Sequence, residues 1–119
     1  MRVETATPVF RVSDYPRAKA FWVDILGFSC VEEAGEPVTG FGIFRRDGAR
    51  VFLTAWDGPE AAYDRWRAYF HVTGFDEVLA DIGARGGVLS SDPVLTEYGM
   101  REFEITDPDG NVVCFGADP

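Results

Sequence analysis

The chain has 119 residues, of which 46% are hydrophobic, and carries a formal net charge of −9 at pH 7. This length favours one domain over residues 1–119, with enough apolar side chains for a core. The acidity argues against binding to nucleic acids and to anionic membranes, because like charges repel. The N-terminal segment lacks the apolar stretch of a signal peptide, and no run is long enough to span a membrane. We therefore expect a cytoplasmic protein with two reduced cysteines.

The first half of the sequence predicts a strand, a helix and three more strands. Alternating residues favour a strand at Thr7–Val12, in which Pro8 marks an edge or a bend. A helix follows, because Ser13 or Asp14 can cap it, apolar residues recur at helical spacing, and Gly27 ends it. The remaining strands and turns are predicted at Phe28–Glu33, Glu36-Pro37 (turn), Val38–Arg45, Asp47-Gly48 (hairpin turn) and Arg50–Trp56.

The second half repeats this order after a break at Asp57-Gly58-Pro59. An Ala/Glu-rich segment leads to a strand at Arg67–Val72. Apolar residues at helical spacing from Phe75 predict a helix that ends at Gly86-Gly87. The predicted elements that follow are a short strand at Val88–Ser90, a turn at Ser91-Asp92-Pro93 and a hairpin over Arg101–Gly116.

The last hairpin organises the candidate site. Asp107-Pro108-Asp109-Gly110 has the residues of a tight turn, because Pro108 presets φ and Gly110 accepts a positive φ. Before this turn, Glu102 and Glu104 alternate with large apolar residues. Side chains alternate between the two faces of a strand, so both carboxylates share one face and the apolar side chains pack on the other.

The two halves show a weak internal repeat. FRVSD (residues 10–14) aligns with FHVTGFD (70–76), and RRDGARVFLTAWD has the spacing of DPDGNVVCFGADP. In this register Phe52 corresponds to Cys114, and Thr7 to Arg67. Any two antiparallel hairpins share part of this likeness, so duplication is the favoured interpretation rather than the sole one. We predict an α+β fold of two tandem βαβββ modules, about residues 5–57 and 65–118, in which a curved mixed sheet surrounds a cleft and the helices lie on its outer face.

The sheet face opposite the helices is the candidate binding surface. By strand alternation it carries aromatic, acidic and basic side chains, and aromatic residues near strand ends add to it. The candidate ligand-binding residues are Glu102, Glu104, Tyr98, Arg67, Tyr69, Phe44, Phe52, Trp56, His71 and Cys114.

Simpler roles remain open for several of these residues. Glu102 and Glu104 are either ligand-binding groups, or solvated carboxylates, or partners of Arg67 and Arg101. His71 is favoured as a hydrogen-bonded sheet residue, and a Cys–His nucleophile with Cys114 requires the two side chains to reach hydrogen-bond distance.

Nearly the whole chain resembles the vicinal oxygen chelate superfamily of glyoxalases, extradiol dioxygenases and antibiotic-resistance proteins. The resemblance is carried by VSDYPRAKAFWVDILGF, by the helix ending in GARGG, and by YGMREFEITDPDGNVVCFG. Enzymes of this superfamily hold a divalent metal with His or Gln, His and Glu at positions that correspond here to Thr7, Arg67 and Cys114. None of the three is the expected ligand, so the resemblance implies a protein without a metal or other cofactor.

Among its branches the chain looks most like the bleomycin-resistance proteins, which are small acidic homodimers that sequester a cationic glycopeptide. The resemblance implies a homodimer, in which Pro8 permits exchange of the first strand between subunits; dimers with and without this exchange both remain open. Tyr98-Gly99 stands where that branch usually has Trp-Gly, and tyrosine offers less stacking area. The leading hypothesis is a metal-free protein that binds a cationic or planar amphipathic ligand in an acidic, aromatic cleft.

Three alternatives are kept. The first is a metal-dependent lyase or dioxygenase of the same superfamily with non-standard ligands among His71, Glu102 and Glu104. The second is a cofactor-free acid–base catalyst, and the third is an interaction module.

Overall fold

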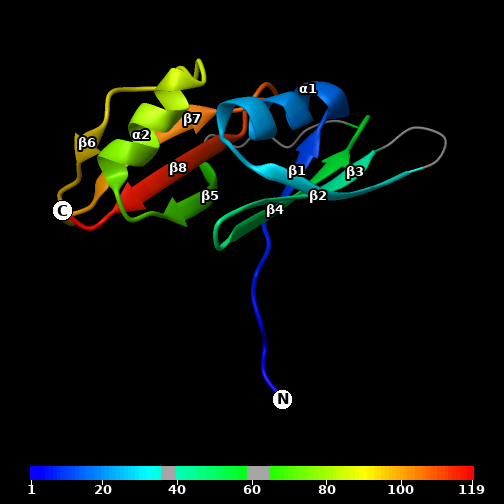
Figure 1. The fold of residues 1–119 in the computed structure, drawn as a ribbon, viewed down its shortest axis with the longest axis horizontal. Coiled ribbons are helices and arrows are strands. Elements are labelled where there is room, and N and C mark those ends of the chain that lie inside the picture. The colour runs from blue at the N-terminus through cyan, green and yellow to red at the C-terminus, as the bar shows by residue number, and fades with distance from the viewer. Residues whose placement is uncertain (36–39, 59–64) are drawn as a thin grey trace.

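The computed structural model describes residues 1–35, 40–58 and 65–119. It contains two modules that lie side by side, each with a helix over one face of a sheet (Figure 1). Four predicted features fall wholly or partly outside the described residues: the turn at Glu36-Pro37, the start of the strand at Val38–Arg45, the break at Asp57-Gly58-Pro59, and the Ala/Glu-rich segment that follows it.

The first module is a four-stranded mixed sheet with a helix above it. The strand order is β1-β4-β3-β2, with β1 parallel to β4 and the other neighbours antiparallel. The elements are β1 (Val9–Val12), α1 (Tyr15–Ala20), the π-helical turn η1 (Phe21–Ile25), β2 (Ser29–Ala34), β3 (Phe41–Arg46) and β4 (Ala49–Ala55). Asp14 caps α1 by accepting a hydrogen bond from the Arg17 amide, as the sequence predicted.

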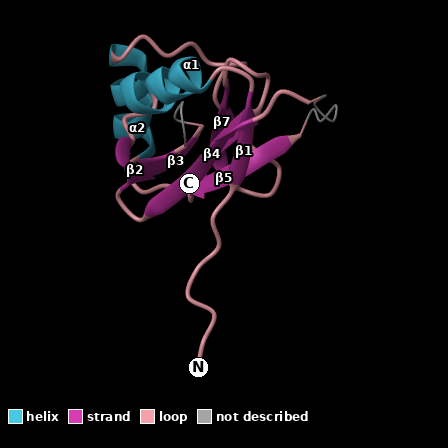
Figure 2. Ribbon diagram, turned by 90° about the vertical axis from the view of Figure 1, so that its right-hand side faces the viewer, coloured by secondary structure: helices cyan, strands magenta, loops and turns pink. Residues whose placement is uncertain are grey.

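The second module has the same strand order, β5-β8-β7-β6. Its first and last strands in the sequence, β5 and β8, are parallel, and β7 and β8 are antiparallel. Its elements are β5 (Trp66–His71), α2 (Phe75–Ala84), β6 (Val94–Leu95), β7 (Arg101–Thr106) and β8 (Val112–Ala117). Both helices lie on the same side of the molecule, and the strands lie on the other (Figure 2). The α+β fold of two βαβββ modules is confirmed, although the strands form two sheets rather than one.

One predicted strand was wrong. Residues Val88–Ser90 are not a strand, and the edge strand is the two-residue β6 at Val94–Leu95. Residues 88–90 make a single backbone hydrogen bond to β7, from the Ser90 amide to the Glu104 carbonyl, and Val88 is 82% exposed. One hydrogen bond does not make a ladder, whereas Val94 and Leu95 pair in register with β7.

Aromatic rings join the two modules. The buried Trp22 ring packs edge-on against Phe10 and Phe28 of its own module, each at 5.0 Å between centroids, and against Phe70 of the second module at 6.3 Å. Edge-to-face contacts of this kind add to the free energy gained by burying the rings. Trp22 thus contacts rings of both modules and lies at the interface between them.

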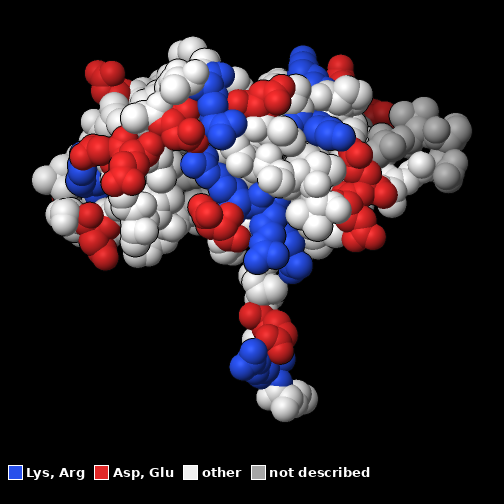
Figure 3. All heavy atoms as spheres, viewed as in Figure 1, with Lys and Arg blue, Asp and Glu red and all other residues white. Residues whose placement is uncertain are grey.

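Polar contacts also join the modules. The turn before β8 reaches the start of α1, where Asp109 Oδ1 accepts hydrogen bonds from the Ser13 amide at 2.9 Å and the Ser13 hydroxyl at 2.5 Å. Arg46 of β3 contacts Asp81 of α2 at 2.9 Å and donates to the Leu26 carbonyl at 2.7 Å. Figure 3 shows basic side chains running through the middle of the molecule, with acidic side chains on both sides.

The N-terminal segment projects away from both modules, and its first six residues are exposed (Figures 1 and 2). None of the helices in the described part of the chain has the length and hydrophobicity needed to cross a membrane.

Candidate functional site

The face of each sheet opposite its helix is termed the open face. On the open face of the second sheet, the backbone register brings together residues from three strands. Glu104 of β7 pairs with Cys114 of β8, Glu102 pairs with Gly116, and Tyr69 of β5 pairs with Cys114 from the other side. The predicted alternation therefore holds on β7, and both carboxylates lie on the open face beside Tyr69.

Glu102 is buried by two tyrosines. Its Oε2 accepts hydrogen bonds from the Tyr69 hydroxyl at 3.0 Å and the Tyr98 hydroxyl at 2.7 Å, and only 5% of the residue is exposed. Tyr98 lies in the loop before β7, where Gly99 adopts a φ of +87° and its amide donates to the Thr96 carbonyl. This positive φ favours glycine and turns Tyr98 back over the strand it precedes. Tyr98 itself stays 62% exposed.

Glycine at position 116 makes room for Tyr69. The Tyr69 ring and hydroxyl lie directly over Gly116, so a Cβ at this position would collide with them. Tyr69 reaches Glu102 by crossing β8 at this gap in the side chains. Burial, followed by its hydrogen bond to Glu102, raises the pKa of Tyr69, so the phenol keeps its proton and remains a donor.

Glu104 has an aromatic partner as well. The indole N–H of Trp66 donates to Glu104 Oε2 at 2.6 Å, and the Trp66 and Tyr69 rings lie 5.0 Å apart. Trp66 reaches the open face because the register of β5 shifts between Trp66 and Ala68, which places Arg67 in a β-bulge. Trp66 was not among the candidate ligand-binding residues from the sequence, because nothing in the sequence marks the bulge that brings it to the open face.

Neither carboxylate is paired with a described lysine or arginine. Arg101 contacts Asp76 at 2.8 Å, and Arg67 Nε donates to Asn111 at 3.1 Å, so the alternative in which these arginines pair with Glu102 and Glu104 is wrong. The donors to both glutamates are neutral phenol and indole groups. The cluster of Glu102, Glu104, Trp66, Tyr69 and Tyr98, termed the acidic–aromatic cluster, therefore contains two carboxyl groups and no basic side chain.

Cys114 lies beneath this cluster as a thiol. It has no exposed surface, and burial together with the nearby Glu102 and Glu104 raises its pKa to about 12. His71 lies at the end of β5 with its side chain largely exposed, and its Nε2 is 3.9 Å from Asp118. No hydrogen bond joins His71 to Cys114 in the described structure, so the two do not form a nucleophile–base pair.

The other candidate residues lie on the first module. Phe52 packs against Phe41 at 5.3 Å and lies under Arg50, whereas Trp56 lies under Arg11 at 4.1 Å. The assignment of Phe44 to the open face was wrong, because Phe44 is fully buried under the helix beside Tyr15. The two-residue hairpin turn pairs Phe44 with Val51 and Ile43 with Phe52, which places Phe44 and Phe52 on opposite faces.

The metal chemistry of related enzymes does not fit these side chains. Of the three corresponding positions, Thr7 accepts hydrogen bonds from Arg50, Arg67 is a cation bonded to Asn111, and Cys114 is a protonated thiol. A divalent cation prefers carboxylate, imidazole or amide donors; the Arg67 guanidinium has no lone pair to offer, and a threonine hydroxyl and a thiol do not supply the expected His or Gln and Glu ligands. Among residues 1–35, 40–58 and 65–119, no three His, Cys, Asp or Glu side chains are grouped to hold a metal.

The family model of the glyoxalase/bleomycin resistance protein/dioxygenase superfamily matches residues 5–115. The chain belongs to this superfamily. The match covers both modules and confirms the resemblance at the level of the superfamily, without selecting one of its branches. No curated protein matches the sequence.

Several solved structures share the fold. A glyoxalase-related enzyme from Clostridium phytofermentans is 19% identical with a TM-score of 0.79, and the alignment covers 100% of this chain and 98% of that one. A glyoxalase/bleomycin resistance protein/dioxygenase from Alicyclobacillus acidocaldarius is 19% identical, with a TM-score of 0.77 and coverages of 99% and 95%. TioX from Micromonospora sp. ML1 is 17% identical, with a TM-score of 0.75 and coverages of 97% and 100%. At these identities the likeness extends to the fold and no further.

Proposed function

We propose that this member of the superfamily binds a cationic, planar or amphipathic small molecule at the acidic–aromatic cluster and releases it unchanged. The observation that carries this proposal is the environment of Glu102: a buried carboxylate, bonded to tyrosine hydroxyls and not to a described lysine or arginine. Such a group attracts a positive charge that the described part of the chain does not supply.

Electrostatics and ring chemistry favour the same class of ligand. Two opposite unit charges about 4 Å apart attract by about 1 kcal/mol in water and about 4 kcal/mol near a protein surface. The faces of Trp66, Tyr69 and Tyr98 add cation–π and stacking contacts to this attraction. The net charge of −9 draws cations toward the molecule from a distance.

Within the superfamily, the bleomycin-resistance branch fits this proposal best. That branch sequesters a cationic ligand, and Tyr98-Gly99 stands in place of its usual Trp-Gly. Tyr98 is exposed and bonded to Glu102, which suits a ring that stacks on a ligand beside a carboxylate. A cationic antibiotic is thus one member of the ligand class we propose, and binding it would give the protein a role in antibiotic resistance. The cytoplasmic location stays a prediction.

We further propose a homodimer. The open face of the second sheet carries Glu102 and Glu104, whereas that of the first sheet carries Arg11 and Arg50 beside Phe52 and Trp56. Two copies that face each other would match acidic to basic surfaces and enclose the acidic–aromatic cluster in a cleft. Exchange of the first strand at Pro8 belongs to this proposal, because the segment before Thr7 is exposed and projects away from both modules.

Titration calorimetry with bleomycin and with proflavine, a small planar cation, tests the binding proposal. We expect binding that weakens as salt rises, and a loss of about five- to tenfold in affinity for Glu102→Gln, since one charge interaction of roughly 1 kcal/mol is removed.

The matched control is Glu97→Gln, which removes the same charge from an exposed position in the loop before β7. Equal losses in both variants would show that overall charge, not the acidic–aromatic cluster, attracts the cations. If neither bleomycin nor proflavine gave a heat of binding, the proposed ligand class would be contradicted.

A further inference from the structure

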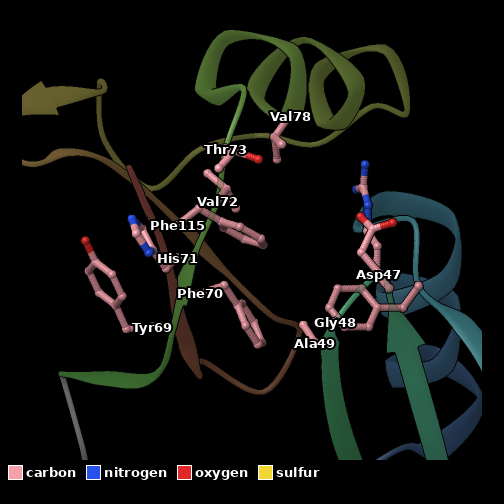
Figure 4. A pocket seen from close by; sticks show the side chains of 12 residues that line it. Asp47, Gly48, Ala49, Tyr69, Phe70, His71, Val72, Thr73, Val78 and Phe115 are labelled. Atoms are coloured by element: carbon pink, nitrogen blue, oxygen red, sulfur yellow. The ribbon is translucent and has the colours of Figure 1, made fainter. Parts of the chain in front are cut away.

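A pocket of about 460 Å³ lies between the two modules, on the helix side of the second sheet. One wall is the hairpin between β3 and β4, and the other is formed by β5, β8 and the start of α2 (Figure 4). Its volume falls within the range of small-molecule sites, which is about 300–1,000 Å³. A molecule bound here would contact both modules.

The second sheet separates this pocket from the acidic–aromatic cluster. Phe70 of β5 pairs with Phe115 of β8, and Phe115 stacks on the buried Phe103 beneath α2. Neighbouring residues of a strand point to opposite faces, so the Tyr69 ring lies on the open face, where its hydroxyl donates to Glu102. Tyr69 borders the pocket, but Figure 4 shows its ring directed away from the hairpin wall. The pocket and the acidic–aromatic cluster are therefore different sites.

The interior of the pocket is apolar and receives rings from both modules. Phe28 comes from the first module, and the Phe70 ring lies 5.9 Å from Phe28 and 5.4 Å from Phe115. Val72 and Val78 extend this lining. Phe70 and both valines are only partly buried, so part of their apolar surface is available to a ligand. A flat ring system seated here would leave water for contact with aromatic rings.

The charged groups at the mouth of the pocket balance one another. Arg46 and Arg85 share the carboxylate of Asp81, at 2.9 Å and 3.0 Å. Asp47 in the hairpin turn supplies a second carboxylate, so two guanidinium groups are matched by two carboxylates. This balance favours neither a cation nor an anion, and transfer of a charge from water into an apolar pocket costs free energy. The pocket thus suits an uncharged molecule.

Two polar groups at the mouth are available to bond such a molecule. Neither the Asp47 carboxylate nor the Thr73 hydroxyl has a hydrogen-bond partner among the described residues. Figure 4 shows the two residues on opposite walls. A carboxylate only accepts hydrogen bonds, so the group that meets Asp47 must be a donor. We propose that the pocket is a second binding site, for an uncharged fused-ring molecule that carries a hydroxyl or N–H donor. This site does not depend on the function proposed above.

Three probes with the same rings test the proposed ligand class. 2-Naphthol is uncharged and carries a hydroxyl donor, whereas 2-naphthoate is an anion and 2-naphthylmethylammonium is a cation. Each is titrated into ¹⁵N-labelled protein, and the amide chemical shifts are followed by NMR. We expect 2-naphthol to shift the amides of Gly48, Ala49, Val72 and Thr73. Its affinity at these amides should exceed that of either charged compound by about tenfold or more, because only the ions lose hydration of a charge.

Variants on each wall test where 2-naphthol binds. Ala49→Phe on the hairpin and Thr73→Phe after β5 add bulk to the pocket and are expected to weaken binding about tenfold or more, the usual scale for losing apolar contacts in a pocket. Thr73 is exposed, so Thr73→Phe tests the site even if Ala49→Phe disturbs the hairpin. Asp47→Gly removes the acceptor while tolerating the φ of +51° at this position, and should weaken binding about two- to tenfold.

Ala80→Phe is the matched control, because Ala80 is exposed on α2 and does not line the pocket. The proposal is overturned if 2-naphthol leaves the lining amides unshifted, if the charged compounds bind there as tightly, or if Ala80→Phe weakens binding as much as Ala49→Phe and Thr73→Phe do. Glu102→Gln should leave the affinity for 2-naphthol unchanged, and a tenfold loss would show that the compound binds at the acidic–aromatic cluster instead. Failure of cations to bind at Glu102 would overturn the proposed function and leave this site standing.

Discussion

At the scale of single residues, Gly116 determines the geometry of the candidate site. It is the position on β8 over which Tyr69 crosses to reach Glu102, and no side chain larger than hydrogen fits beneath the ring. The sequence shows a glycine in a strand, which commonly marks a close approach. It does not show which group approaches, because that depends on the pairing of β5 with β8.

Gly116→Ala is expected to displace Tyr69 from Glu102 and to lower the free energy of unfolding by about 1–3 kcal/mol, the usual cost of adding a methyl group to a filled site. Gly83→Ala is the contrasting variant, since a Cβ at Gly83 in α2 meets open space. It should raise the stability by about 0.5–1 kcal/mol, because alanine favours a helix over glycine. Urea denaturation measures both, and a stabilising Gly116→Ala would contradict the observed packing.

Cys114 is expected to be unreactive in the folded protein. With its pKa raised to about 12, it is almost entirely a thiol at pH 8, and it is also fully buried. Ellman's reagent followed by mass spectrometry should label Cys114 only after unfolding, whereas Cys30 is partly exposed and should be labelled faster. Rapid labelling of Cys114 at pH 8 would show that the second sheet opens more readily than its packing indicates.

At the scale of elements, the sequence predicted the order of strands and helices well and the irregular features poorly. The paired carboxylates of β7 and the turn before β8 follow from local alternation and turn residues, which the sequence contains. The bulge at Arg67, the two-residue β6 and the inward-facing Phe44 depend on which strands pair and in which register. Those features arise from contacts between distant residues, so a single strand's pattern does not determine them.

The turn before β8 contains a buried carboxylate with a testable pH dependence. Asp107 accepts hydrogen bonds from the amides of Asp109 and Asn111 and from the Asn111 side chain, yet burial outweighs these bonds and raises its pKa above the ordinary 3.8. Between the ordinary pKa and the raised pKa, Asp107 binds more protons in the folded state than in the unfolded state. The contribution of Asp107 to stability therefore falls as pH rises through this interval.

Asp107→Asn removes this titration. We compare the free energy of unfolding of the original protein with that of the variant. The difference, original minus variant, is expected to decrease as pH rises from about 3.8 toward neutrality. Urea denaturation at a series of pH values measures this difference, and an increase over the same interval would mean that hydrogen bonding outweighs burial at Asp107.

At the scale of the whole molecule, the two modules depend on a shared interface. Trp22 contacts rings of both modules and is fully buried, so its removal should weaken both together. We expect Trp22→Ala to cost about 3–5 kcal/mol, the usual range for removing a large buried aromatic side chain. Far-UV circular dichroism and amide hydrogen exchange should show that strands of both modules are destabilised.

Trp66→Ala is the matched control, because Trp66 is 38% exposed and lies on the open face. It should cost about 1 kcal/mol, since it removes one hydrogen bond and exposed ring surface. If Trp22→Ala left β5 and β8 as protected as before, the second module would be stable without the interface at Trp22.

The contact between Ser13 and Asp109 also has a consequence for synthesis on the ribosome. The two residues are 96 positions apart, and Asp109 is the acceptor for both the amide and the hydroxyl of Ser13. The nascent first module can pair its four strands once β4 has emerged, but this contact must wait until β7 and the following turn are translated. A stalled chain that ends before Asp109 would therefore contain the first module without the hydrogen bonds from Ser13 to Asp109 at the start of α1. A chaperone or protease would meet the first module in this incompletely bonded state.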